Sequence, residues 1–211
     1  VNAQGSSRAL EDAKSRFASA EGDAVTLLNV HRGWRGSGRS AAWAHRHMLN
    51  PSALFRADTA RDQLLGALRR SGLLSADTPP PSCEGDMERV CRALASGLFP
   101  HAAVFEGTQH NPLAPESDPG VHCYRLLRYT AAGQRAHPLK LRIHASSVLC
   151  RSTPSCVVFA AVQQQAGAGR SSSSSSGGGG WFEMQGVTAI RPEWLPEIAP
   201  HMFHKPDRLA R

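Results

Sequence analysis

Residues 139–144 read Leu-Lys-Leu-Arg-Ile-His, in which apolar and basic side chains alternate. A period of two is typical of a strand that is buried on one face. The apolar residues then face a core, and the opposite face carries Lys140, Arg142 and His144. Such a row suits contact with phosphates. The alternative is a solvated edge strand whose charges suppress aggregation.

The positive charge of the chain is concentrated around this strand. The 211 residues include 24 Lys and Arg against 17 Asp and Glu, which gives a net charge of +7. No acidic residue lies between Asp118 and Glu183, and seven basic residues in that window account for the whole excess. A basic balance favours an acidic partner, with nucleic acid or an anionic surface as the leading candidates.

Patterning predicts an α+β protein, with a small helical bundle followed by a five-stranded barrel and a terminal helix. In the first part, Asp23, Ser40 and Asn50 precede helical periodicity as N-caps, and Gly72 ends the third helix. The second part has five short β-like runs, which suit an OB-fold-like barrel. These runs are 101–105, 121–129, 139–144, 155–162 and 184–190.

Composition predicts the domain boundaries. A polar lead-in, which can be the end of a preceding helix, precedes the helical segment, and a Pro-rich linker separates that segment from the barrel. A Ser/Gly tract with nothing to bury is expected to be a disordered insertion in the barrel. The expected ranges are 1–22 (lead-in), 23–74 (helical), 75–86 (linker), 87–204 (barrel, insertion 163–180) and 205–211 (tail).

The five cysteines form no Cys-x-x-Cys pair, so zinc-ribbon and redox motifs are absent, and we expect no metal site. Reduced thiols indicate an intracellular reducing compartment, the nucleus or the cytoplasm, with an organelle left open. No apolar run is long enough for a membrane span. Trp34, Trp43 and Trp194 are expected in cores, whereas Trp181 beside the glycine run is expected to be exposed.

Four blocks of sequence resemble DEAH/RHA-type ATP-dependent RNA helicases. Residues 23–30 (DAVTLLNV) are similar to the DHLTLLNVY stretch of their helical domain, and residues 90–100 (VCRALASGLFP) to the helix that enters their OB-fold. Residues 143–149 (IHASSVL) resemble IHPSSVLF, and residues 187–203 resemble the closing VTAIDPEWLxELAPHFF. The departures are Ala24 for histidine, Ala145 for proline and Arg191 for aspartate. The blocks occur in family order over nearly the whole chain.

The resemblance implies a C-terminal auxiliary region of such a helicase, with a remnant of the helical "ratchet" domain and an OB-fold that contacts single-stranded RNA. In the family, upstream RecA-like and winged-helix domains of the same polypeptide form the motor, which uses ATP and Mg²⁺, and the OB-fold of several members faces G-patch-type activators. The residues expected to contact the RNA backbone are Lys140, Arg142, His144, Ser146 and Ser147, with Arg125 and Arg128 ranked below them. The alternative for Ser146 and Ser147 is a purely structural turn.

The chain itself shows no catalytic motif. No lysine ends a Gly-rich phosphate-binding loop, no DEAH box is present, and no Gly-x-Ser-x-Gly nucleophile elbow occurs. We therefore expect no catalytic residue and no cofactor in this chain. Because it begins at Val1 and its first methionine is Met48, we expect it to be the tail of a longer protein. The rival functions are a protein-interaction module for an activator or scaffold, and a stand-alone single-strand-binding protein.

Overall fold

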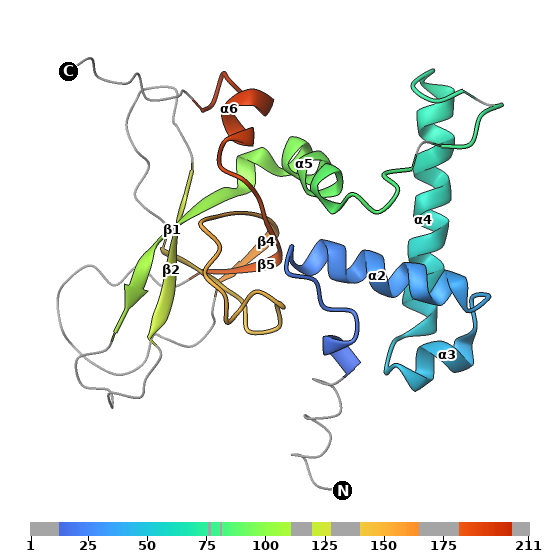
Figure 1. Cartoon of the computed structure of the whole chain (residues 1–211), viewed down its shortest axis with the longest axis horizontal. Coiled ribbons are helices and arrows are strands. Elements are labelled where there is room, and N and C mark those ends of the chain that lie inside the picture. Colours follow the sequence, from blue (N-terminus) through green and yellow to red (C-terminus); the bar gives the residue numbers. More distant parts are fainter. Residues whose placement is uncertain are drawn as a thin grey trace, which may run out of the picture. The chain divides into compact units, whose positions relative to one another are not determined.

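The computed structural model describes residues 13–75, 77–80, 82–110, 120–127, 140–164 and 182–203 (Figure 1). The chain divides into two compact units. A helical unit comprises residues 1–18 and 26–86, and a barrel unit comprises residues 19–25 and 87–211. Residues 19–25, which the sequence pattern divides between lead-in and helical segment, thus group with the barrel.

The helical unit contains α2 (Asp23–Gly36) beyond its first turn, α3 (Ala41–Arg46) and α4 (Pro51–Arg70). The predicted cap of α3 is confirmed, since the Ser40 hydroxyl accepts a hydrogen bond from the Trp43 amide. The predicted cap of α4 is also confirmed, since Asn50 Oδ1 accepts from two first-turn amides. Trp34 is fully buried in a core that also holds Val30, Ala44 and Leu54, as expected for a large ring at helical spacing.

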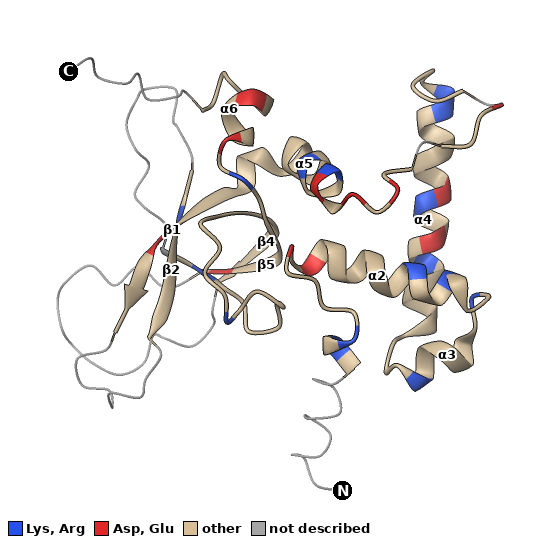
Figure 2. Ribbon diagram, in the orientation of Figure 1, with Lys and Arg blue, Asp and Glu red and all other residues tan. Residues whose placement is uncertain are grey.

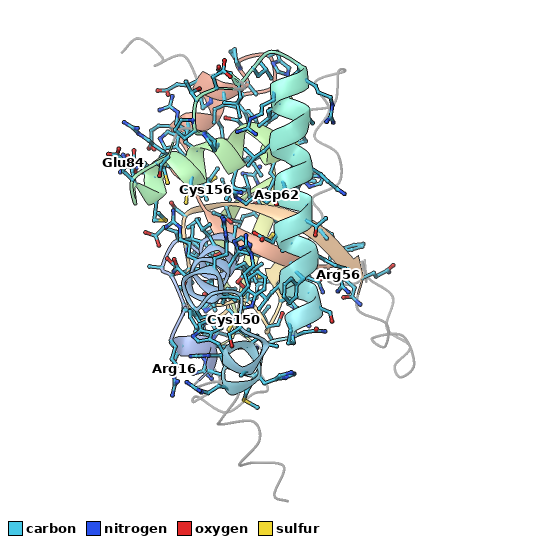
Figure 3. The ribbon with its side chains drawn as sticks, turned by 90° about the vertical axis from the view of Figure 1, so that its right-hand side faces the viewer. Arg16, Arg56, Asp62, Glu84, Cys150 and Cys156 are labelled. Carbon is cyan, nitrogen blue, oxygen red and sulfur yellow. The ribbon has the colours of Figure 1, made fainter. Side chains whose placement is uncertain are left out.

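Basic and acidic side chains alternate along α4 (Figure 2), and Arg56 and Asp62 are labelled on it in Figure 3. Among the described charged residues of α4, Asp58 alone is buried, with 7% of its surface exposed. The Arg39 Nε donates to Asp58 Oδ2 at 2.7 Å, and His31 Nε2 lies 3.3 Å from Oδ1. The hydrogen bond from Arg39 holds the pKa of Asp58 below its ordinary value.

The barrel unit confirms the predicted fold class. Five strands close in the order β1-β2-β3-β5-β4, in which only β3 and β5 pair in parallel. The other neighbouring strands pair antiparallel, and the parallel pair arises because β5 crosses over to lie between β3 and β4. The strands are β1 (Ala102–Gln109), β2 (Val121–Leu126), β3 (Lys140–Ile143), β4 (Cys156–Gln164) and β5 (Phe182–Ala189).

Two apolar clusters hold the barrel unit together. One fills the barrel interior, where burial raises the pKa of Tyr124 to about 12 and its hydroxyl donates to the Pro154 carbonyl. The other lies under α5 (Met87–Leu98), the 3₁₀ turn η1 (Phe99–His101) and α6 (Trp194–Ile198), and it contains the buried Trp194. The expected terminal helix is therefore present and contributes to a core.

The structure differs from the sequence expectations at several places, among them the end of β1, which runs to Gln109. Strand β4 runs through Gln163 and Gln164, which pair with Glu183 and Phe182, so these two glutamines belong to the sheet and not to the Ser/Gly insertion. Asp23 is the first residue of α2 and not the residue before it, and its carboxylate accepts hydrogen bonds from residues far along the chain. The predictions for Arg128, Trp181, the rest of the insertion and the 205–211 tail fall outside the described residues.

All five cysteines are free thiols. Cys91, Cys123 and Cys156 are buried, and burial raises the pKa of the Cys156 thiol to about 11. Cys150 is partly exposed, and both Cys150 and Cys156 are labelled in Figure 3. Among the described residues, no group of His, Cys, Asp and Glu could hold a metal ion. Over the same residues, no helix has the length and apolar character needed to cross a membrane.

Candidate nucleic-acid interface

The basic row of β3 is partly neutralised by a residue of the neighbouring strand. Arg142 stands opposite Glu183 in the parallel β3–β5 ladder. Its Nε and Nη2 both donate to Glu183 Oε1, at 2.9 Å and 2.5 Å. The side chains are 26% and 16% exposed, so the pair is partly screened from solvent. Arg142 therefore presents to a ligand only the part of its guanidinium that Glu183 leaves accessible.

His144 follows β3 and is fixed by the turn behind it. The Ser146 amide donates to His144 Nδ1 at 3.0 Å, and the Ser146 hydroxyl lies 2.7 Å from the same nitrogen. Because Nδ1 accepts a hydrogen bond from the amide, Nε2 carries the ring proton, and this nitrogen lies 3.7 Å from Glu183 Oε2. Glu183 thus faces two of the three residues in the predicted row. The backbone of Lys140 pairs with Arg125, and the prediction for the Lys140 side chain falls outside the described part of the chain.

Ser146 and Ser147 point to different surroundings. Ser146 is exposed, whereas Ser147 is 5% exposed and its hydroxyl donates to Asp23 Oδ1 at 2.9 Å. The Leu149 amide donates to the Ser147 hydroxyl at 3.2 Å. The structure therefore gives Ser147 the turn-forming role that sequence analysis left as the alternative, and places Ser146 where a ligand can reach it.

Arg125 is paired within the barrel. Its Nε donates to Glu106 Oε1 of the adjacent strand β1 at 2.6 Å. Glu106 belongs to β1 and Glu183 to β5, and acidic positions on both strands are red in Figure 2. The sequence has no acidic residue between Asp118 and Glu183. Strand pairing nevertheless brings Glu106 to Arg125 and Glu183 to Arg142.

An open pocket of about 330 Å³ lies at the end of β3. Apolar side chains of Val121, Ile143 and Ala145 and polar side chains of His122, Arg142 and Glu183 contribute to its lining. Cys150 and Ser152 also line it, and the exposed Arg151 lies between these two residues in the sequence. Arg151 has no ion pair with any described residue. Sequence analysis counted it in the basic window but not among the site residues, since no strand or motif singled it out.

Arg191, at a position where the family has aspartate, forms an ion pair with Glu88. Its Nη2 donates to Glu88 Oε2 of α5 at 2.7 Å, and its guanidinium carbon lies 5.7 Å from the centre of the Trp194 ring. Both contacts use the positive charge that the substitution introduces. This departure therefore fits the surrounding structure.

Comparison with known proteins agrees with this architecture. The chain is similar to the probable ATP-dependent RNA helicase DHX35 of Homo sapiens, with 30% identity over 196 residues, 92% of this chain and 22% of that protein. It is 27% identical to the ATP-dependent RNA helicase DHX33 of Mus musculus over 209 residues, 96% of this chain and 23% of the relative. The chain therefore spans about a fifth of the length of the curated relatives it matches.

A family model described as the oligonucleotide/oligosaccharide-binding (OB)-fold matches residues 90–202. This range contains most of α5, all five strands and α6. The matched range therefore coincides with the barrel and the helices that complete its second core. Because the match covers more than half of the sequence, the chain belongs to this OB-fold family, a C-terminal domain of DEAH-box helicases.

Proposed function

We propose that the barrel unit binds single-stranded RNA through its sugar-phosphate backbone, as an auxiliary region of a DEAH-type ATP-dependent RNA helicase. The observation that carries the proposal is the open pocket at the end of β3, which Arg142 lines. The exposed Ser146 and Arg151 each neighbour another lining residue in the sequence. Guanidinium and hydroxyl groups are the donors that proteins use for phosphate oxygens. The similarity to RNA helicases of the DHX35 and DHX33 type supports RNA as the ligand.

The same surface argues against base-specific recognition. No Phe, Tyr or Trp is among the described residues that line the pocket, so base stacking has no platform there. Phosphate contacts carry no sequence information and release counterions. With two phosphates neutralised by Arg142 and Arg151, log K falls by about 1.4 per tenfold rise in salt, or roughly sevenfold in affinity between about 50 and 200 mM.

The test is fluorescence anisotropy with a labelled single-stranded RNA over a salt series. We compare the unmodified chain with a variant carrying Arg142→Gln and Arg151→Gln. Because two phosphates then lack their arginine, binding weakens and the slope of log K against log salt becomes shallower by about 1.4. Arg92→Gln, which removes an arginine of α5 that pairs with Glu197, is the control and leaves both quantities unchanged. A double variant with unaltered affinity and slope would place RNA binding elsewhere or nowhere on this chain.

The proposal extends to the rest of the polypeptide. RecA-like and winged-helix domains that precede this region would form the motor, and ATP with Mg²⁺ would be used there. A nuclear or cytoplasmic location suits the five free thiols. Sequencing the native transcript upstream of the Val1 codon tests this directly. An in-frame Gly-Lys-Ser/Thr loop and a DEAH-type box are expected. A nearby start codon without them would leave a stand-alone RNA-binding protein.

A protein-interaction module is the second candidate, and exposed apolar residues of the helical unit favour it. Leu64 of α4 is 66% exposed and Leu73 after it is 73% exposed, while Phe55 and Leu68 are also exposed. Leu64 and Leu68 are four residues apart and so share one face of α4. Exposed apolar patches commonly mark protein contacts. A G-patch-type activator is the proposed partner. Binding of a purified G-patch protein after nuclease treatment, weakened by Leu64→Glu and Leu68→Glu, together with no RNA affinity, would favour this function.

A further inference from the structure

Asp23 bonds to two separate parts of the barrel unit. Its Oδ1 accepts from the Ser147 hydroxyl and from the Val148 amide, both at 2.9 Å. Its Oδ2 accepts from the Val187 amide of β5 at 2.8 Å. All three donors belong to the barrel unit, as does Asp23 itself. One carboxylate thus joins the loop after β3 to strand β5.

The position of Asp23 follows from how the sheet ends. Strand β3 pairs with β5 only as far as Ile143 and Met184, which leaves the following residues of β5 without a neighbouring strand on that side. Residues 21–23 occupy this edge. The Ala189 amide donates to the Glu21 carbonyl at 2.8 Å, Gly22 bridges Thr188, and the Val187 amide donates to the Asp23 carboxylate. These backbone donors of β5 are thereby satisfied.

Gly22 is what allows this close approach. Its φ is +120°, and a Cβ placed there would lie 2.3 Å from the Val187 carbonyl oxygen. Any side chain would therefore push residues 21–23 away from β5. The local sequence Gly22-Asp23 thus combines a backbone that can lie against the strand with a carboxylate that reaches the loop beyond it.

The loop that Asp23 holds is the one that carries the proposed RNA contacts. The Ser147 amide donates to the His144 carbonyl and the Cys150 amide to the Ser147 carbonyl, so a continuous turn runs from the end of β3 to the pocket rim. Ser147 sits in the middle of this turn, with its hydroxyl on Asp23. Moving Ser147 would therefore displace Ser146 on one side and Arg151 on the other.

We propose that Asp23 is the positioning residue of the RNA-binding surface, holding the loop 144–151 in the shape that presents its donors to phosphates. This inference rests on the proposed function. It predicts that removing the Asp23 carboxylate weakens RNA binding, which is the opposite of what charge alone predicts. Removing a carboxylate from a protein that binds a polyanion strengthens binding when only long-range electrostatics change. Removing a positioning carboxylate weakens binding instead, because the donors of the loop are no longer ordered.

The experiment uses the whole chain with Asp23→Asn and the same labelled single-stranded RNA. Asparagine keeps one acceptor oxygen but turns an amino group towards an amide donor, so one of the two connections is broken. We expect binding to weaken by about fivefold or more and the salt slope to become shallower by about 0.7 for each phosphate that the loop no longer binds. Glu193→Gln removes one exposed negative charge from the same unit and is the matched control, which leaves binding equal or tighter.

Amide hydrogen exchange gives a readout that does not depend on RNA. In Asp23→Asn, the Val148 or the Val187 amide exchanges faster than in the unmodified chain, while the β1–β2 amides keep their protection. Binding that is unchanged or tighter, with faster exchange at Val148, would overturn the inference and leave the proposed function standing. An unmodified chain that binds no RNA would defeat the proposed function itself, and the inference with it.

Ser147→Ala provides a second variant if Asp23→Asn does not fold. It removes one hydrogen bond to Asp23, keeps the Val148 bond and changes no charge. A structural role alone would lower the melting temperature and leave RNA affinity below the transition unaltered, which would also contradict the inference. Weaker RNA binding at a temperature where the variant is fully folded would support it.

Discussion

If Arg142 contacts phosphate as proposed, Glu183 competes for the same guanidinium, and replacing Glu183 should strengthen RNA binding. In Glu183→Gln the carboxylate that accepts from Arg142 Nε and Nη2 becomes neutral. A phosphate bound to the outer side of Arg142 then no longer meets a negative charge on its inner side. At a separation of about 4 Å, two like charges in water repel by about 1 kcal/mol. Since the pair is only 26% and 16% exposed, this bulk-water value is a lower bound, and it corresponds to at least roughly fivefold tighter binding.

Fluorescence anisotropy at low salt measures this difference, since screening reduces it as salt rises. Glu88→Gln is the matched control because it removes a carboxylate that pairs with Arg191 of the same unit, away from the pocket. The RNA affinity of Glu88→Gln should stay within about twofold of the unmodified chain, because salt screens the interaction between an exposed charge at Glu88 and RNA bound at the pocket. Thermal unfolding of both variants shows whether removal of an ion pair has altered the fold.

Two results would refute the reasoning. Weaker binding by Glu183→Gln, with an unchanged melting temperature, would mean that Glu183 orients Arg142 for the ligand and does not compete with it. Equal binding in the two proteins would mean that Arg142 does not contact phosphate at all. Only the second result would shift the proposed contact from Arg142 to the exposed Arg151.

Three further perturbations have defined outcomes. Gly22→Ala should destabilise the barrel unit by at least about 2 kcal/mol, because of the +120° φ and the close approach to the Val187 carbonyl, and chemical denaturation measures this. Asp58 has a lowered folded-state pKa, so its stabilising contribution is present above the ordinary value of 3.8 and disappears as pH falls through the lower folded value. Asp58→Asn should therefore melt at a lower temperature at neutral pH and differ less from the unmodified chain once the pH falls below the lowered pKa of Asp58, as followed by circular dichroism. Iodoacetamide should modify the partly exposed Cys150 well before Cys156, whose thiol is buried with a pKa of about 11, and peptide mass spectrometry would show the reverse order if this burial is wrong.

Local patterns in the sequence were sufficient to predict most of the helices and strands. The alternation at residues 139–144 predicted β3, and Ser40 and Asn50 predicted the starts of α3 and α4. These signals depend on side chains within a few residues of each other, so they are readable without the fold. The ends of the strands were less predictable, and β4 extends to Gln164 because its partner strand continues to Phe182.

The candidate site was predicted only as a set of basic and hydroxyl residues. Spacing could place Arg142 and His144 on one face, but it could not show that Glu183, 41 residues away, lies opposite them. It also could not separate Ser146 from Ser147, since only a tertiary contact buries one and leaves the other exposed. Arg151 was missed because its significance comes from the pocket beside it.

By itself, the sequence determined the element types, their order and the concentration of positive charge, because these follow from composition and short-range periodicity. The tertiary structure decided which charges remain available to a ligand. Asp23 reaches Ser147 and Val187 across 124 and 164 residues, and the parallel pairing of β3 with β5 is what creates the edge that it fills. Such contacts depend on how the chain returns to itself in space, and no local pattern in the sequence encodes that distance.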